Sequence, residues 1–165
     1  MVSRLVEAEL SRYDWAQLYT CGGTAEQVPA AVRGMLESVS GDEVDRYYWR
    51  LENRVVVQQA LYSSAPAVIG ALLAGLADDI AFPARVGALE LLYQIASGES
   101  GPEAVVEGKP NLGHECRTLV RKGLWIIYRQ LFIGPGDAAS DLLEVIETDV
   151  DRLEKMREIA KFKKR

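Results

Sequence analysis

The chain has 165 residues, of which 48% are hydrophobic and 26% charged, and its formal net charge is −5 at pH 7. Such a length is most simply one domain with a sizeable core. The acidic balance argues against nonspecific binding to nucleic acid or anionic membranes and suits a basic protein partner. Two widely separated cysteines and an N-terminus without a signal-peptide pattern favour a cytoplasmic protein without disulfides.

Apolar residues recur at helical spacing along the chain, and no alternating run is long enough to predict a sheet. A short helical cap is expected before the Gly22-Gly23 turn. Thr24-Ala-Glu-Gln27 then has the pattern of a capping box, which predicts a helix start. Ser40-Gly41-Asp42 separates this helix from a second one, which is expected to reach Tyr62. The first predicted pair of antiparallel helices therefore covers residues 24–62.

The second predicted pair covers residues 65–98. Pro66 and Pro83 each suit the first turn of a helix, and Gly98 suits a C-terminal stop. Residues 55–77 contain no charged residue and are long enough to span a bilayer, but polar residues interrupt their middle. We therefore expect two buried helices that meet at Ser63-Ser64, and no membrane partner.

The C-terminal part is predicted to hold a third helix pair, residues 114–158. Residues 98–113 precede it and are rich in Gly, Pro and Glu, which predicts a long loop that is either functional or mobile. Gly134-Pro135-Gly136 breaks the third pair before a long last helix. The basic tail, residues 159–165, is expected to fray.

The segment 66–98 resembles a HEAT repeat. It has a Pro that opens the first helix, paired Leu residues, Asp in the turn and Arg-Val near the start of the second helix. The matching residues are Pro66, Leu72, Leu73, Asp78 or Asp79, Arg85, Val86, Ala88, Leu92, Ile95 and Gly98. Residues 29–51 are similar to a weaker copy. The resemblance implies an all-α, HEAT-like solenoid of about three antiparallel helix pairs with an N-terminal helical cap. It also implies that Arg85 pairs with an Asp of the turn.

Two charged rows are the candidate binding residues. Arg46, Arg50 and Arg54 recur every four residues and would present a basic row on one helix. Their function would be to hold a carboxylate-rich segment, and the alternative is a solvated face paired with nearby acids. Asp141, Glu144 and Asp151 would form an acidic row on the last helix. This row would suit a cationic partner, or it is a solvated acidic face.

Three consecutive aromatic residues, Tyr47, Tyr48 and Trp49, cannot all point in one direction on a helix. At least one is expected at the surface, and Trp49 is a candidate interface anchor. Packing against a neighbouring helix is the alternative for each. Trp125, Tyr128 and Phe132 are expected in the core.

The sequence indicates binding rather than catalysis. Its one histidine lies in His114-Glu115-Cys116, and no second cluster completes a metal site, so no catalytic residue, metal or cofactor is expected. A further pattern consists of Trp49-x-Leu51, Leu61-Tyr62, Ala65-Pro66-Ala67-Val68 and Ile95-Ala96-x-Gly98. Through it the chain resembles small bacterial HEAT-like proteins, some of which are immunity proteins or scaffolds. The leading hypothesis is an immunity or antitoxin-type inhibitor that occludes a basic toxin. The alternatives are a scaffold or adaptor for an acidic peptide, and a HEAT-like nucleic-acid-processing enzyme.

Overall fold

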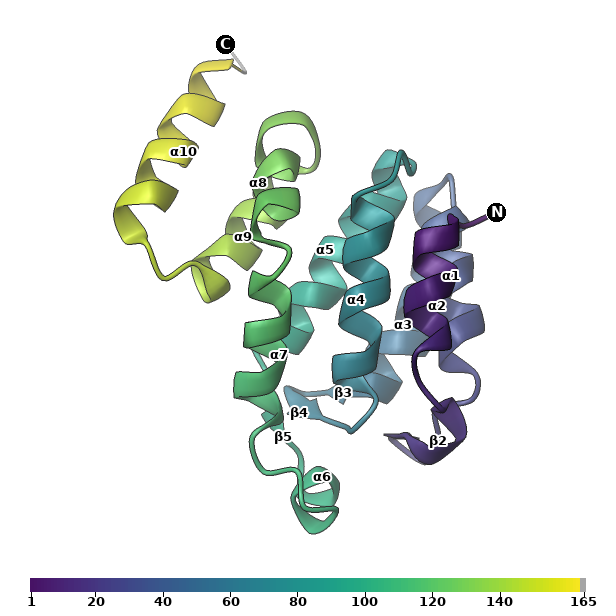
Figure 1. The fold of residues 1–165 in the computed structure, drawn as a ribbon. Helices are drawn as coiled ribbons and strands as arrows, with labels where there is room; N and C mark the ends of the chain where they lie inside the picture. The colour runs from purple at the N-terminus through teal and green to yellow at the C-terminus, as the bar shows by residue number, and fades with distance from the viewer. Residues whose placement is uncertain (164–165) are drawn as a thin grey trace.

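The computed structural model of the chain describes the backbone of residues 1–163 and the side chains of residues 1–161. Over this range the fold is mostly helical, as predicted (Figure 1). The helices are α1 (Arg4–Ser11), α2 (Val28–Glu37), α3 (Gly41–Val55), α4 (Ala65–Leu76), α5 (Phe82–Ala96), α6 (Pro102–Val106), α7 (Leu112–Arg121), α8 (Leu124–Ile133), α9 (Gly136–Ile146) and α10 (Val150–Lys163), with a 3-10 turn, η1, at Trp15–Gln17. The strands, each of two residues, are β1 (Tyr19–Thr20), β2 (Gly23–Thr24), β3 (Val56–Val57), β4 (Ala60–Leu61) and β5 (Glu99–Ser100).

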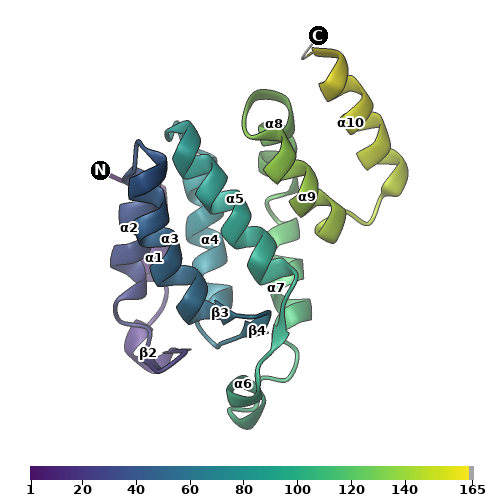
Figure 2. The same ribbon diagram turned by 180° about the vertical axis from the view of Figure 1, so that it is seen from behind.

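The helices form two layers that follow the chain from one end of the molecule to the other. Helices α1, α4 and α7 contact one another in succession in one layer, and α3, α5 and α9 do so in the other. The first layer is in front in Figure 1 and the second is in front in Figure 2. Helix α2 packs on α3, and α10 contacts α8 and α9 at the far end. The apolar sides of both layers meet in one continuous core.

Helix α4 lies in the middle of this arrangement, and its position explains its uncharged sequence. Ten of its twelve residues are buried, because α1, α2, α5, α7 and α8 all contact it. Helices α4 and α5 both carry Pro in the first turn, as predicted. None of the helices in residues 1–163 combines the length and the apolar character needed to cross a membrane.

The predicted ion pair in the turn between α4 and α5 is confirmed. Nη2 of Arg85 lies 3.0 Å from Oδ1 of Asp79. The Nε of Arg85 also donates a hydrogen bond of 2.9 Å to the carbonyl oxygen of Ile80. The guanidinium therefore closes the turn.

The prediction that α3 continues to Tyr62 is wrong, as is the expectation of no sheet. Helix α3 ends at Val55, and β3 and β4 form a tight antiparallel hairpin. Gln58 and Gln59 form its turn with φ of 49° and 68°. Three consecutive valines, 55–57, prefer extended backbone, which explains why the helix stops here.

The predicted long loop at residues 98–113 also contains regular structure. Strand β5 pairs in parallel with β4, so the sheet has the order β3-β4-β5. Helix α6 follows and projects from the lower end of the molecule in Figure 1. The capping box at Thr24 is wrong too, because Thr24 lies in β2 and the N-cap of α2 is Gln27.

The predicted third helix pair is divided into four helices, α7 to α10. Lys122-Gly123 separates α7 from α8, and residues 147–149 separate α9 from α10, so the single long last helix is wrong. Helix α10 continues through the predicted frayed tail to Lys163, and residues 164–165 lie outside the described residues.

Candidate functional site

Helix α3 carries the predicted basic row and the predicted aromatic anchor. Arg46, Arg50 and Arg54 are all exposed, and none of them forms an ion pair within residues 1–161. As expected, the consecutive aromatic residues do not all point in one direction: Tyr48 is buried, whereas Trp49 is 55% exposed. The two rings meet edge to face with centroids 5.4 Å apart, so Trp49 is held in place while remaining accessible.

The predicted acidic row is not one surface on one helix. Asp141 and Glu144 lie on α9, whereas Asp151 lies in the first turn of α10. All three are exposed, but the Glu144 carboxylate lies 3.4 Å from Nη2 of Arg157. The row was predicted from continuous helical spacing, and the break between α9 and α10 removes that spacing.

The turn between α9 and α10 contains a buried carboxylate, that of Glu147. Its side chain is 1% exposed and accepts hydrogen bonds from the Tyr128 hydroxyl at 2.6 Å and from Nε and Nη2 of Arg152 at 2.8 and 3.0 Å. These bonds, those of Arg152 first, lower the pKa of Glu147 to about 2. Trp125, predicted to be in the core, is instead 61% exposed, and Arg152 stacks on it at 5.4 Å. We call this group the Glu147 clasp.

Three carboxylates from different helices gather on the α3-α5-α9 layer: Asp45 of α3, Glu90 of α5 and Asp137 of α9. Burial, and then the nearby charge of Asp45, raise the pKa of Glu90. Glu90 and Asp137 line a common hollow. None of the three forms an ion pair within residues 1–161. We call them the three-helix carboxylate group.

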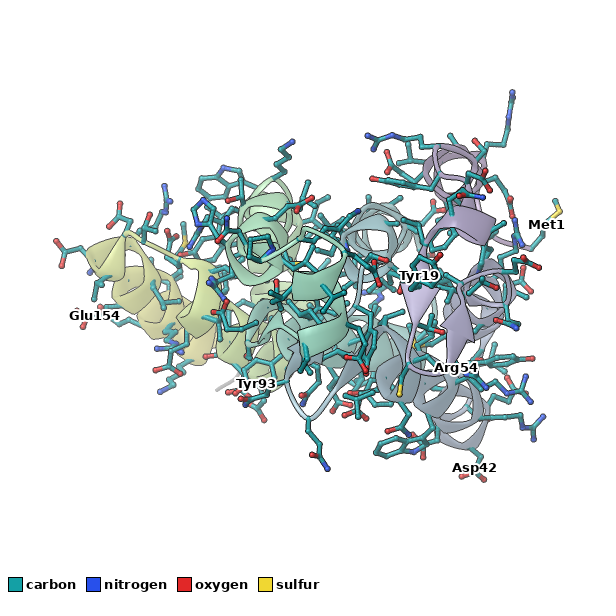
Figure 3. The ribbon with its side chains drawn as sticks, turned by 90° about the horizontal axis from the view of Figure 1, so that it is seen from below. Met1, Tyr19, Asp42, Arg54, Tyr93 and Glu154 are labelled. Carbon is teal, nitrogen blue, oxygen red and sulfur yellow. The ribbon has the colours of Figure 1, made fainter. Side chains whose placement is uncertain are left out.

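The α5-α9 hollow has a volume of about 340 Å³ and lies between the N-terminal half of α5 and the start of α9. Phe82, which is 59% exposed, and Val86 form its wall on α5. The full lining is Phe82, Val86, Glu90, Gly134, Pro135, Gly136, Asp137 and Ala138. Tyr93 lies one helical turn beyond Glu90 on the same exposed ridge, and Figure 3 shows it on the same side of the molecule as Asp42 of α3.

This combination fits the side chain of a lysine or an arginine. The apolar walls suit a methylene stem, the face of an exposed Phe attracts a cation, and two carboxylates complement the positive charge. The hollow is open to solvent on a layer that also exposes Trp49 and Tyr93. Exposed aromatic residues with a polar rim are typical of protein interfaces.

The sequence reasoning missed Phe82 and Glu90. A signal was present in the sequence of α5. The buried side of this helix is apolar, and its spacing leaves four residues on the outward side: Phe82, Val86, Glu90 and Tyr93. Their partner, Asp137, is distant in sequence and reaches them only through the packing of α9 on α5.

The remaining candidates for chemistry are apart from this hollow. Cys116 is buried, and burial raises the pKa of its thiol to about 12, while the neighbouring His114 is exposed on α7. No group of three or more His, Cys, Asp or Glu residues within residues 1–161 could hold a metal ion. Comparison with protein-family models, with curated proteins and with solved structures finds no match to this chain.

Proposed function

We propose that this chain is a protein-binding module whose α5-α9 hollow receives a basic side chain of a protein partner. The observation that carries the proposal is the pair of carboxylates, Glu90 and Asp137, that flank an exposed Phe82 without an ion pair inside the described chain. Carboxylates without an ion-pair partner gain more from a bound cation than carboxylates already neutralised by arginine.

We further propose that the helices form a HEAT-like solenoid, with α2 and α3, α4 and α5, and α7 to α9 as its successive units. The contacts of α3 with α5 and of α5 with α9 support this arrangement. The second helices of the units would then form the binding face. The two free cysteines are consistent with the cytoplasmic location that we infer for the protein.

In its specific form the proposal is an immunity or antitoxin-type inhibitor that occludes a basic toxin domain. The three-helix carboxylate group presents a wide field of one sign to an approaching partner. Complementary charge of this kind accelerates association more than it slows dissociation. Trp49, Phe82 and Tyr93 would supply the desolvated contacts that hold the complex.

The test is capture of the partner by the tagged protein from its native host, followed by kinetics with the purified partner. The double variant Glu90→Lys/Asp137→Lys should lower the association rate at least about tenfold, and added salt should shrink the difference. Glu103→Lys/Glu115→Lys is the matched control with the same change of net charge, because both residues are exposed and neither lines the hollow. A captured partner without a basic surface, or equal rates for both variants, would refute the proposal.

A further inference from the structure

A second pocket lies on the opposite edge of α3, away from the three-helix carboxylate group. It has a volume of about 320 Å³ and is lined by Gln27, Val28, Ala30, Ala31, Tyr47, Arg50 and Arg54. Arg54 lies in the last turn of α3, and Figure 3 labels it in the same part of the molecule as Asp42. We call this the α2-α3 pocket, and it does not overlap the α5-α9 hollow.

The side chains of the α2-α3 pocket are arranged before any ligand arrives. A Cβ at Gly34 would collide with the Tyr47 ring, so this ring lies directly against α2. The guanidinium of Arg50 lies over the same ring, 5.6 Å from its centroid. Both Arg50 and Arg54 lack an ion-pair partner in residues 1–161 although acidic residues are plentiful on α3. The two charges are therefore available to an external anion.

The spacing of the basic row indicates the form of that anion. Residues four apart on a helix are separated by about 6 Å along its axis. Carboxylates at alternate positions of an extended peptide are separated by about 6.6 to 6.8 Å, and they point to one side. Arg46, Arg50 and Arg54 thus match three alternate acidic residues of an extended segment, and the row turns toward the pocket as it approaches Arg54.

We propose that the basic row and the α2-α3 pocket together bind an extended acidic segment of a protein partner, with one carboxylate side chain seated between Arg50 and Arg54. A short segment is favoured over a nucleic-acid strand because Asp42 and Asp45 lie on the same helix, and they would repel a continuous polyanion. This inference concerns a second site and does not rest on the function proposed for the hollow.

The experiment measures fluorescence anisotropy with labelled peptides of identical composition. One peptide alternates Glu with Ser, and the other carries the same Glu residues as one block followed by the Ser residues. The alternating peptide should bind at least about fivefold more tightly, and Arg50→Gln/Arg54→Gln should weaken its binding at least about tenfold. Lys122→Gln/Arg129→Gln is the matched control, because both residues are exposed, neither lines the pocket, and their loss should leave affinity unchanged. Circular dichroism verifies that each variant is folded.

Several results would overturn the proposal. Equal affinity for the two peptides, or an equal loss with Lys122→Gln/Arg129→Gln, would show that only the overall charge of the protein attracts the peptide. Displacement of the peptide by equimolar inorganic phosphate would indicate a small-anion site, and tighter binding of a single-stranded oligonucleotide would indicate a nucleic-acid surface. Self-association in sedimentation that disappears in the double Arg variant would make a second copy the occupant. The partner captured through the hollow should still bind this variant, so the two proposals fail separately.

Discussion

Helices α4 and α10 are held to the rest of the molecule by opposite means. Helix α4 has no charged residue, and its contacts are almost entirely apolar, with Leu72 and Leu76 fully buried. Helix α10 has two arginines that connect it to α8 and α9: Arg152 in the Glu147 clasp, and Arg157, which hydrogen-bonds Ser140. The centre should therefore be insensitive to pH and salt, whereas the attachment of α10 should depend on both.

The largest effect is expected from a cavity in the centre. Leu72→Ala should lower the free energy of unfolding by about 3 kcal/mol, because the side chain is completely buried and its neighbours come from several helices. Urea denaturation monitored by circular dichroism measures the loss. A change below about 1 kcal/mol would mean that α4 does not contribute to the cooperative core.

Removal of the charge at Glu147 should affect α10 and leave the centre intact. Glu147→Gln replaces a buried carboxylate that accepts two bonds from Arg152 and one from Tyr128. Amide hydrogens of α10 should exchange about tenfold faster, while those of α4 keep their protection. Glu154→Gln, at an exposed position of α10, is the control. Equal acceleration in α4 would show that the two regions unfold as one unit.

The pH dependence of α10 follows from the same group. The pKa of Glu147 is lowered to about 2 by hydrogen bonds, so its contribution is complete above the usual carboxylate pKa and is lost as pH falls toward 2. Burial, and then the bond to Glu147, raise the pKa of Tyr128 to about 12, so its contribution is present below pH 10 and is lost as pH rises toward 12. Exchange of α10 amides should therefore accelerate at both extremes. Glu147→Gln should remove the acidic limb.

The smallest effect is expected at the hairpin that leads into α4. Gln58 and Gln59 both have positive φ, which costs residues with a Cβ free energy, whereas Asn-Gly suits this turn. Gln58→Asn/Gln59→Gly should raise the free energy of unfolding by about 1 kcal/mol in urea titrations. A loss of stability would show that the two glutamine side chains stabilise the turn.

The sequence predicted the fold best where local and tertiary signals agree. Pro66 and Pro83 open the helices that they were expected to open, and Arg85 closes the turn between them. Prediction failed around Val56, because short apolar runs have no distinctive period and Gln58-Gln59 has no turn composition. The break at residues 147–149 was equally hidden, since no Gly or Pro marks it.

The candidate site was predictable only in part. The basic row lies on a single helix, so helical spacing was sufficient to identify Arg46, Arg50 and Arg54 as a set, and their role stays a prediction. The hollow is made by α5 and α9 together, and spacing within one helix gives no information about such contacts. Periodicity also joined Glu144 and Asp151 into one row, although a turn separates them.

The hydroxyl of Ser100 identifies a loop into which additional residues could be inserted. Ser100 Oγ donates to the carbonyl oxygen of Lys109 at 2.7 Å and accepts from the backbone N–H of Leu112 at 2.9 Å. The Ser100 side chain thus connects the end of β5 to the start of α7, and the segment between them, which contains α6, forms a loop closed by these two hydrogen bonds. An epitope or a small reporter domain inserted near Gly108 would lengthen a loop whose ends are already joined, at little entropic cost. Gly108 lines neither of the two proposed sites, so an insertion there would leave their lining residues unchanged.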